Sequence, residues 1–228
     1  MRLLRCARRH RGTMSVTLKI NEIFFSIQGE SLLAGKPTVF VRTAHCNLRC
    51  VWCDTKYAYW QGEPKTIDEI LAKVKEHETE YVCVTGGEPL AQKNVSELMS
   101  RLLAEGYIVS LETNGSFSIK DVPLKVIKVI DIKCPGSGES EKMAWENLEM
   151  VQPHDQFKFV VASKEDFDWA QELCTKHHLH EKCPVLYSPV YGKVKPADLA
   201  SWILKAKAPV TMQMQLHKEI WGPEERGV

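Results

Sequence analysis

Short runs of β-branched and aromatic residues alternate with helical patterns along this chain, and the alternation restricts the folds that it can adopt. The runs that predict strands are residues 18–27, 38–43, 80–85, 107–112, 126–132, 156–161, 184–187 and 209–215. Apolar spacing predicts helices in residues 66–77 and 93–105, after Ser163 and from Pro196 onward. Alternation of this kind indicates right-handed crossovers and a mainly parallel sheet that is covered by helices.

The length of the chain argues against a closed barrel. A complete eightfold barrel typically takes ~250 residues, and this chain has 228. We therefore expect an α/β fold that forms an incomplete, TIM-like barrel with mainly parallel strands and outer helices. Functional groups should gather beyond the carboxyl ends of the strands. Because 44% of the residues are apolar and 26% are charged, we expect one packed domain over residues 17–228.

The first residues differ from the rest in charge. Residues 1–13 contain five arginines and no acid, although the formal net charge of the whole chain is only +1. We expect a disordered, arginine-rich tail over residues 1–16. The remainder is mildly acidic, which argues against nucleic acid as a partner because phosphate binding needs clustered Lys and Arg. No apolar run approaches the ~20 residues of a membrane span, so no membrane partner is expected either.

Three cysteines, Cys46, Cys50 and Cys53, lie close together in the segment HCNLRCVWCDT. The segment follows a strand-like run, so it should lie at the functional rim of the sheet. Closely spaced thiolates can each bind a separate iron of a cubane cluster, because soft sulfur ligands suit iron and sulfide. Three protein ligands leave one iron open, and that iron can bind a small molecule through an amine and a carboxylate.

Two other interpretations of the cysteines stay open. Structural zinc would need a fourth ligand, such as His45, Cys83 or Cys134, although the sequence has no second closely spaced pair of ligands. A thiol redox pair formed by Cys50 and Cys53 would leave Cys46 unexplained. Clustered cysteines indicate metal ligation in a reducing compartment, and the cytoplasm fits.

A glycine pair follows another predicted strand, in the segment VTGGEP at residues 84–89. Gly86 and Gly87 allow close backbone approach and unusual dihedral angles, and Glu88 supplies an acceptor for an ammonium group. The segment therefore predicts a cofactor-binding loop, with a plain turn as the alternative.

The cysteine and glycine motifs together resemble those of the radical S-adenosylmethionine (radical SAM) enzymes, in which a [4Fe-4S] cluster reduces SAM to release a 5′-deoxyadenosyl radical. The segment EIFFSIQGES at residues 22–31 resembles the E-x-F-x-S-x-Q-G-E signature of the 7-carboxy-7-deazaguanine synthase family. The similarity continues through VFVRTAHCNLRCVWCDT, LETNG, DIKCPGSG and MQLHKEIWG, so the matching segments cover residues 22–222.

The resemblance implies a lyase that acts on 6-carboxy-5,6,7,8-tetrahydropterin. In this family the radical removes a hydrogen atom from C6, the ring contracts with help from Mg²⁺, and ammonia is lost to give 7-carboxy-7-deazaguanine for queuosine or other 7-deazapurines. No residue is assigned as a general acid or base. The family also implies a homodimer and an electron donor such as flavodoxin or ferredoxin. Alternatives are a radical SAM activating enzyme that acts on a protein glycyl residue, and a zinc-binding interaction module.

The resemblance also implies roles for individual residues. Cys46, Cys50 and Cys53 would hold the cluster, and Thr55 would ligate Mg²⁺, while a loop or capping role is open for Asp54. The implied SAM contacts are Trp52, Gly87, Glu88, Glu112, Asn114, Asp131, Ile132 and Lys133. The implied substrate contacts are Ile27, Gln28, Gly29, Glu30, Arg42, Thr85 and His217. Glu30 would read the guanidine-like edge of the pterin, and Arg42 would bind its carboxylate.

The chain departs from the family pattern in places. His45 stands where family members often have glycine, which leaves the backbone of the cysteine loop open at that position. Four other cysteines match no ligand pattern, and we interpret them as small apolar packing residues: Cys83, Cys134, Cys174 and Cys183.

Overall fold

A nine-stranded sheet runs through residues 16–223 and 225–228, the part of the chain that the computed structural model describes. The strands are β1 (Thr17–Ile27), β2 (Pro37–Thr43), β3 (Glu63–Thr66), β4 (Tyr81–Gly86), β5 (Ile108–Thr113), β6 (Ile127–Asp131), β7 (Gln156–Val161), β8 (Val185–Pro189) and β9 (Thr211–Met212). Their order in the sheet is β3-β1-β2-β4-β5-β6-β7-β8-β9. Every pair from β2 to β9 is parallel, whereas β1 is antiparallel to both β2 and β3.

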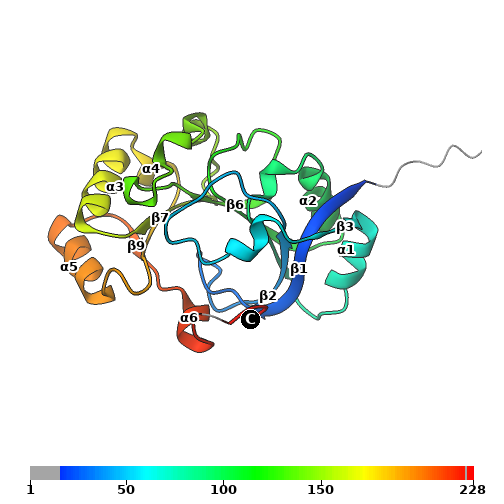
Figure 1. Ribbon diagram of the computed structural model, residues 1–228. Coiled ribbons are helices and arrows are strands. Elements are labelled where there is room, and N and C mark those ends of the chain that lie inside the picture. The colour runs from blue at the N-terminus through cyan, green and yellow to red at the C-terminus, as the bar shows by residue number, and fades with distance from the viewer. Residues whose placement is uncertain (1–15, 224) are drawn as a thin grey trace, which may run out of the picture.

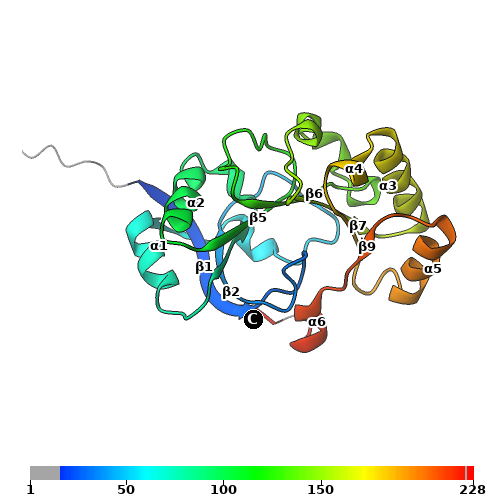
Figure 2. The same ribbon diagram turned by 180° about the vertical axis from the view of Figure 1, so that it is seen from behind.

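Helices cover the outer side of this curved sheet, as Figures 1 and 2 show. They are α1 (Ile67–Val74), α2 (Val95–Ala104), α3 (Lys164–Lys176), α4 (Leu179–Lys182) and α5 (Pro196–Ala206). A further short helix, α6 (Leu216–Ile220), lies against the connection between β1 and β2. The strands β3 and β9 are the two ends of the sheet, so the barrel stays open. The prediction of an incomplete barrel with mainly parallel strands and outer helices is confirmed. In the described ranges, no helix combines the length and apolar character that crossing a lipid bilayer requires.

The main helices begin and end where their sequence predicts. The Thr66 hydroxyl accepts a hydrogen bond from the Glu69 backbone N–H at 3.2 Å, and the Glu69 carboxylate accepts one from the Thr66 backbone N–H at 2.7 Å. This reciprocal capping box starts α1 and satisfies two donors that would otherwise be unpaired. Gly106 follows α2 with a φ of +93°, a left-handed conformation that glycine adopts without strain.

Alternating strand residues separate the core from the interior of the barrel. In β7, Phe157, Phe159 and Val161 are buried in the hydrophobic core, whereas Lys158 and Val160 line a cavity on the opposite face. The four cysteines for which the sequence predicts a packing role are also buried, in agreement with that role: Cys83, Cys134, Cys174 and Cys183. The inner, concave side of the sheet therefore carries the polar groups of the cavity, whereas the side that faces the helices is mainly apolar.

Some elements differ from the prediction. The strand β3 was not predicted, because it is short, polar and contains Pro64, which a strand tolerates only at a sheet edge. In the predicted strand 209–215, only Thr211–Met212 pair with β8, and the chain then turns into α6. His217 consequently lies on a helix and not in an apolar strand. The predicted tail falls outside the described residues, apart from Val16.

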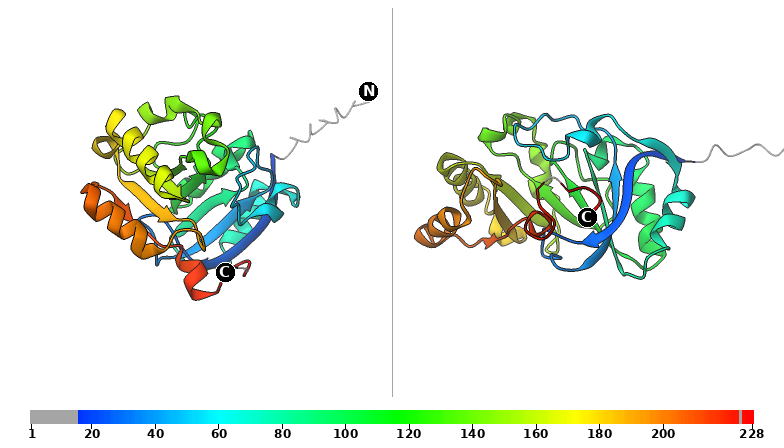
Figure 3. Two further views of the ribbon diagram at one scale, coloured as in Figure 1. Left: turned by 60° about the vertical axis from the view of Figure 1, so that its left-hand side comes forward. Right: turned by 60° about the horizontal axis from the view of Figure 1, so that its bottom comes forward.

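The last helix returns to the start of the fold. The Leu216 backbone N–H donates to the Gly29 carbonyl at 3.0 Å, and the Ser31 backbone N–H donates to the Gln213 side chain at 2.8 Å. Figure 3 shows α6 and the residues after it beside β1. The segment after β9 thus reaches across the open side of the barrel.

Candidate active site

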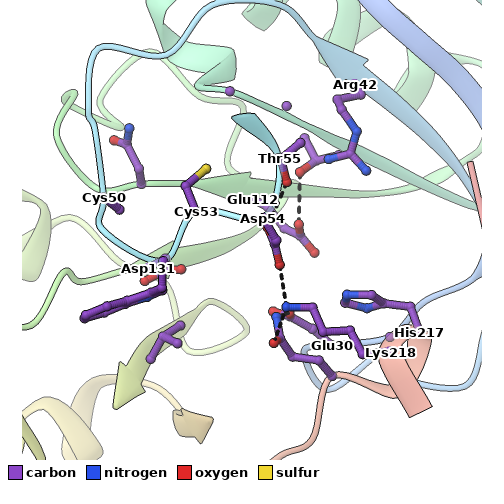
Figure 4. A pocket seen from close by; sticks show the side chains of 18 of the residues that line it. Glu30, Arg42, Cys50, Cys53, Asp54, Thr55, Glu112, Asp131, His217 and Lys218 are labelled. Carbon is purple, nitrogen blue, oxygen red and sulfur yellow. Dashed lines mark hydrogen bonds and ion pairs between the residues drawn. The ribbon is translucent and has the colours of Figure 1, made fainter. Parts of the chain in front are cut away.

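A cavity of about 390 Å³ lies at the carboxyl ends of the parallel strands, where the sequence predicts the functional groups to gather. Its size is that of a small-molecule site. The β1–β2 connection, the loop after β2, the ends of β4 to β7 and the residues from α6 onward all contribute side chains. Cys50 and Cys53 lie on one side, and Glu30, His217 and Lys218 lie on the other (Figure 4).

The structure brings together nearly all of the residues that the sequence predicts for this site. Those that line the cavity are Ile27, Gln28, Gly29, Glu30, Arg42, Cys46, Cys50, Trp52, Cys53, Thr55, Thr85, Gly87, Glu112, Asn114, Asp131, Lys133 and His217. Glu88 and Ile132 do not line it, because both side chains are buried behind the wall.

The cysteine loop, residues 44–55, directly follows β2. His45 has a φ of +75°, so the loop keeps the left-handed conformation that glycine favours, and histidine is among the residues that tolerate it. Arg49 holds the loop by donating through Nη1 to the Cys46 and Leu48 carbonyls at 2.8 and 2.7 Å. Its guanidinium also stacks on Tyr59, 4.3 Å from the ring centroid. Arg49 therefore fixes a loop that hydrophobic packing alone would hold poorly.

The three thiols of this loop fit an iron–sulfur cluster. Burial raises the pKa of Cys46 and raises the pKa of Cys50 to about 11, against the smaller opposing effect of Lys133 at Cys50. In the described part of the chain, no three His, Cys, Asp or Glu side chains converge as a site for one metal ion. Soft thiols spread along one wall suit a polynuclear cluster, in which each sulfur binds a different iron. The Asn114 amide also reaches the Cys46 sulfur, at 3.7 Å.

The glycine pair lets the end of β4 pass against the cysteine loop. A Cβ atom on Gly87 would lie 2.2 Å from the His45 carbonyl oxygen, and one on Gly86 would lie 2.3 Å from the Thr43 carbonyl oxygen. Gly86 also has a φ of +149°, which few other residues adopt. The glycines are therefore required by close backbone contact, as the sequence predicts, although the atoms contacted belong to the chain itself.

Glu88 lies behind the cavity wall and is held by groups of the chain itself. Its carboxylate accepts from the Asn114 backbone N–H at 2.6 Å, the Thr113 hydroxyl at 2.8 Å and the Leu90 backbone N–H at 2.9 Å. Burial raises its pKa to about 7, and these hydrogen bonds oppose the rise. Because the carboxylate is fully buried and already hydrogen-bonded, it braces the end of β5, and its contact with a ligand ammonium stays a prediction.

Charged side chains form a chain of contacts across the floor of the cavity. Lys133 Nζ lies 3.0 Å from Asp131 Oδ2, and Lys158 Nζ lies 3.4 Å from the same oxygen. Lys158 also forms an ion pair with Glu30, whose other oxygen accepts from Gln215 Nε2 at 2.6 Å. Lys158 was not predicted, although a lysine among the apolar residues of a predicted strand is a signal that the sequence contains.

The Gln28–Glu30 segment and Arg42 are held by neighbouring carboxylates. Gln28 Nε2 donates to Glu112 at 3.3 Å, and the Thr85 hydroxyl donates to the other Glu112 oxygen at 3.0 Å. Arg42 Nε donates to Glu22 Oε1 at 2.6 Å, and this hydrogen bond fixes the direction of the planar guanidinium group. Burial opposes the charge of Arg42, but the Tyr57 phenol and Glu22 outweigh burial and raise its pKa.

Oxygen donors follow the last cysteine. The Thr55 hydroxyl donates to Asp54 Oδ1 at 2.9 Å, and Lys218 Nζ lies 2.6 Å from Asp54 Oδ2. Burial alone would raise the pKa of Asp54, but the Lys218 ammonium lowers it to about 2. Asp54 thus stays ionised and links the cysteine loop to α6, a contact that no sequence motif indicated. Other cavity residues that the sequence did not single out are Tyr57, Tyr59, Tyr191, Lys193, Glu225 and Arg226.

Comparison with known proteins shows the family to which this chain belongs. The radical SAM superfamily model matches residues 40–128. The 7-carboxy-7-deazaguanine synthase of Koribacter versatilis is 41% identical over an alignment 226 positions long, which covers 92% of this chain and 100% of that protein. The synthase of Chlorobaculum tepidum is 45% identical over an alignment 214 positions long, which covers 92% of this chain and 97% of that one. The chain belongs to the 7-carboxy-7-deazaguanine synthase family.

The fold agrees with this membership. The crystal structure of QueE from Escherichia coli matches with a TM-score of 0.73 at 20% identity, over 87% of this chain and 94% of that one. Members of the 7-carboxy-7-deazaguanine synthase family are radical SAM enzymes, so the cofactors of this chain are a [4Fe-4S] cluster and SAM. The resemblance seen in the sequence, the fold class and the two cofactors are confirmed.

Proposed function

We propose that this chain converts 6-carboxy-5,6,7,8-tetrahydropterin to 7-carboxy-7-deazaguanine with loss of ammonia, for queuosine or another 7-deazapurine. One observation carries the proposal: the cysteine loop, the Gln28–Glu30 segment and Arg42 all line a single cavity. A cofactor-derived radical and a pterin can therefore meet without crossing solvent. The names of the family relatives, which specify the product, support the same reaction.

Radical generation would belong to the cysteine side of the cavity. Cys46, Cys50 and Cys53 would hold the [4Fe-4S] cluster, and together with SAM the cluster supplies the organic radical that starts the reaction. The side chains that would contact SAM are Trp52, Glu112, Asn114, Asp131 and Lys133, with the backbone of Gly87. Asp131 Oδ1 supports this assignment, because it is a buried oxygen that has no hydrogen-bond partner in the described residues. A ligand N–H or O–H group would satisfy it.

Substrate binding would belong to the opposite side. The guanidine-like edge of a pterin presents two N–H groups in parallel, and the Glu30 carboxylate can accept both. The Arg42 fork suits the carboxylate of the substrate, since Glu22 already fixes its direction through Nε. Ile27, Gln28, Gly29, Thr85 and His217 would complete the pocket. Glu30 and Arg42 thus match an edge of donors and an anionic group on one small molecule.

Further partners follow from the same resemblance. Thr55 would bind Mg²⁺ beside Asp54, because hydroxyl and carboxylate oxygens are the hard ligands that this cation prefers. We infer a homodimer, an electron donor such as flavodoxin or ferredoxin, and a cytoplasmic location that keeps the cluster thiols reduced. Nucleic acid is not expected as a partner, since the chain after its arginine-rich start is mildly acidic.

An anaerobic assay with the carboxytetrahydropterin, SAM, a reductant and Mg²⁺ tests the proposal directly. The wild-type protein should release 7-carboxy-7-deazaguanine and ammonia in equal amounts and should contain iron and sulfide. Glu30→Gln should lose pterin turnover yet still cleave SAM slowly, because the substitution leaves the cysteine side intact. SAM cleavage that is stimulated by a glycyl-radical protein and not by the pterin would show an activating enzyme instead. A zinc-loaded protein without iron would show a binding module.

A further inference from the structure

Lys158 is a buried cation that none of the assigned roles explains. It occupies an inward position of β7, between Phe157 and Phe159, whose side chains pack into the core on the other face. Lysine is among the residues least often buried, because an unpaired ammonium is costly away from water. A lysine at this position therefore indicates a specific electrostatic requirement of the cavity.

Two carboxylates hold the Lys158 ammonium from different sides. Asp131 is its register partner on β6, and Lys158 Nζ lies 3.4 Å from Asp131 Oδ2. Because adjacent strands place register partners on the same face, this contact is built into the sheet. The second carboxylate is that of Glu30, which arrives from the β1–β2 connection. The ammonium is thus fixed between a residue of the SAM side and a residue of the substrate side.

Glu30 depends on this ammonium for its charge. Burial raises the pKa of Glu30, and the Lys158 ammonium, with smaller contributions from Gln215 and His217, outweighs burial and leaves the pKa lowered. The other charged or titratable groups around the pair are Asp131, Lys133, Glu112, His217 and Lys218. Without Lys158, Glu30 would be a buried carboxyl group beside the carboxylates Asp131 and Glu112. Both burial and like charge then favour its protonated form.

We propose that Lys158 is a positioning residue that keeps Glu30 ionised, so that the Glu30 carboxylate can accept both N–H groups of the pterin edge. A protonated carboxyl group would direct its own O–H toward those donors and could accept from only one of them. The inference rests on the proposed function for the identity of the ligand. The control of Glu30 ionisation by Lys158 can nevertheless be measured without any substrate.

Infrared titration of the protein without substrate measures that control. In Lys158→Met, the carbonyl band of a protonated carboxyl group should be present near pH 7 and disappear as the pH rises. Glu88, whose pKa is raised to about 7, contributes a band of its own to each of these proteins. Beyond that shared band, no band should be present at this pH in the wild type, in Lys158→Arg or in the double variant Glu30→Gln/Lys158→Met. If Lys158→Met does not fold, Lys158→Gln removes the same charge while its amide can still donate to both carboxylates. A wild-type band that Glu30→Gln removes at or above about pH 5 would overturn the proposal.

Pterin affinity supplies the functional readout. The measured quantity is the dissociation constant for the pterin in Lys158→Met, divided by that in the wild type. This ratio should grow by up to about tenfold for each pH unit below the pKa that Glu30 has in Lys158→Met. Taking the ratio cancels the titration of the free pterin, which both proteins share. A ratio that does not vary between about pH 6 and about pH 8.5 would overturn the proposal.

Lys128 provides a matched control. It is a buried lysine on β6, 3.0 Å from Asp155 Oδ2, and it does not line the cavity. Lys128→Met should lower the stability as a broken buried ion pair does, yet its pterin dissociation constant should follow the wild-type pH dependence. The infrared result and the pterin result separate the two proposals. A Glu30 band in Lys158→Met with no pterin binding by the wild type would refute the proposed function and leave the role of Lys158 standing.

Discussion

Gly29 lies where the Gln28–Glu30 segment meets α6. A methyl group added at this position should lower the activity measurably. A Cβ atom at this position would lie 2.4 Å from His217 Nδ1 and 3.0 Å from the His217 backbone nitrogen. An ordinary contact begins at 3.4 Å, so Gly29→Ala must displace the His217 imidazole by about 1 Å and the α6 backbone by about 0.4 Å. Rotation of the His217 side chain can relieve the first contact but not the second, and either response moves the imidazole out of its place in the cavity.

The size of the effect follows from that displacement. A misplacement of about 1 Å in a positioned group costs about 100-fold in rate, which corresponds to about 2.7 kcal/mol of transition-state stabilisation. The hydrogen bond from the Leu216 backbone N–H to the Gly29 carbonyl would also weaken, with a stability loss of about 1 kcal/mol. We therefore expect kcat/KM for the pterin to fall about 100-fold while the protein stays folded.

Anaerobic steady-state kinetics over a range of pterin concentrations measures this loss. Gly35→Ala is the control, because Gly35 belongs to the same connection and its added Cβ would meet no atom within 4 Å. Its φ of +88° makes that substitution cost about 1 kcal/mol of stability without moving α6. If Gly29→Ala kept kcat/KM within threefold of the wild type, the argument that α6 must be seated on Gly29 would be refuted.

The remaining predictions concern the cluster, the substrate carboxylate and a buried acid. Cys53→Ala should lose cluster iron and its absorption under anaerobic conditions, whereas Cys183→Ala, at a buried packing position, should retain both; equal iron in the two proteins would contradict the ligand assignment. Arg42→Lys should raise KM for the pterin by about tenfold or more, since a lysine cannot form the bidentate pair; an unchanged KM would remove Arg42 from substrate binding. Glu88 has a pKa raised to about 7 in the folded chain, so the folded state retains a proton that the unfolded state has lost. Its contribution to the stability of the cofactor-free protein is complete below about pH 4.5 and disappears as the pH rises through about 7, by about 3 kcal/mol relative to Glu88→Gln. Chemical denaturation of both proteins across this range checks the difference, and parallel stability curves would exclude Glu88 as the cause.

Much of the fold could be predicted from the sequence because its elements carry strong local patterns. The strands that build the barrel are apolar runs with turn residues at both ends, and α1 has a complete capping box. The strand β3 was missed because its pairing with β1 comes from backbone groups and not from apolar side chains. The segment after β9 was missed because Gln213 and Gln215 make their hydrogen bonds with Ser31 and Glu30, far away in the sequence.

The site could be predicted where its residues lie in short motifs and not where they depend on contacts between distant elements. The cysteine loop and the Gln28–Glu30 segment are continuous in sequence, so a pattern could identify them. Lys158 and Lys218 are single residues whose importance comes from their carboxylate partners. The hydrogen bonds that Glu88 accepts from the Leu90 and Asn114 backbone N–H groups could not be predicted either, because the residue type alone does not reveal which donors a carboxylate meets.

The position of α6 in the chain also has a consequence for biogenesis. Ribosomal synthesis makes the cysteine loop early and delivers Gln215, His217 and Lys218 only after all strands of the sheet have been made. The thiols that we propose as cluster ligands are thus made before the α6 side of the cavity. The cluster can therefore be assembled before the cavity is complete. An insertion just before α6 would yield a protein that carries iron but does not retain its substrate.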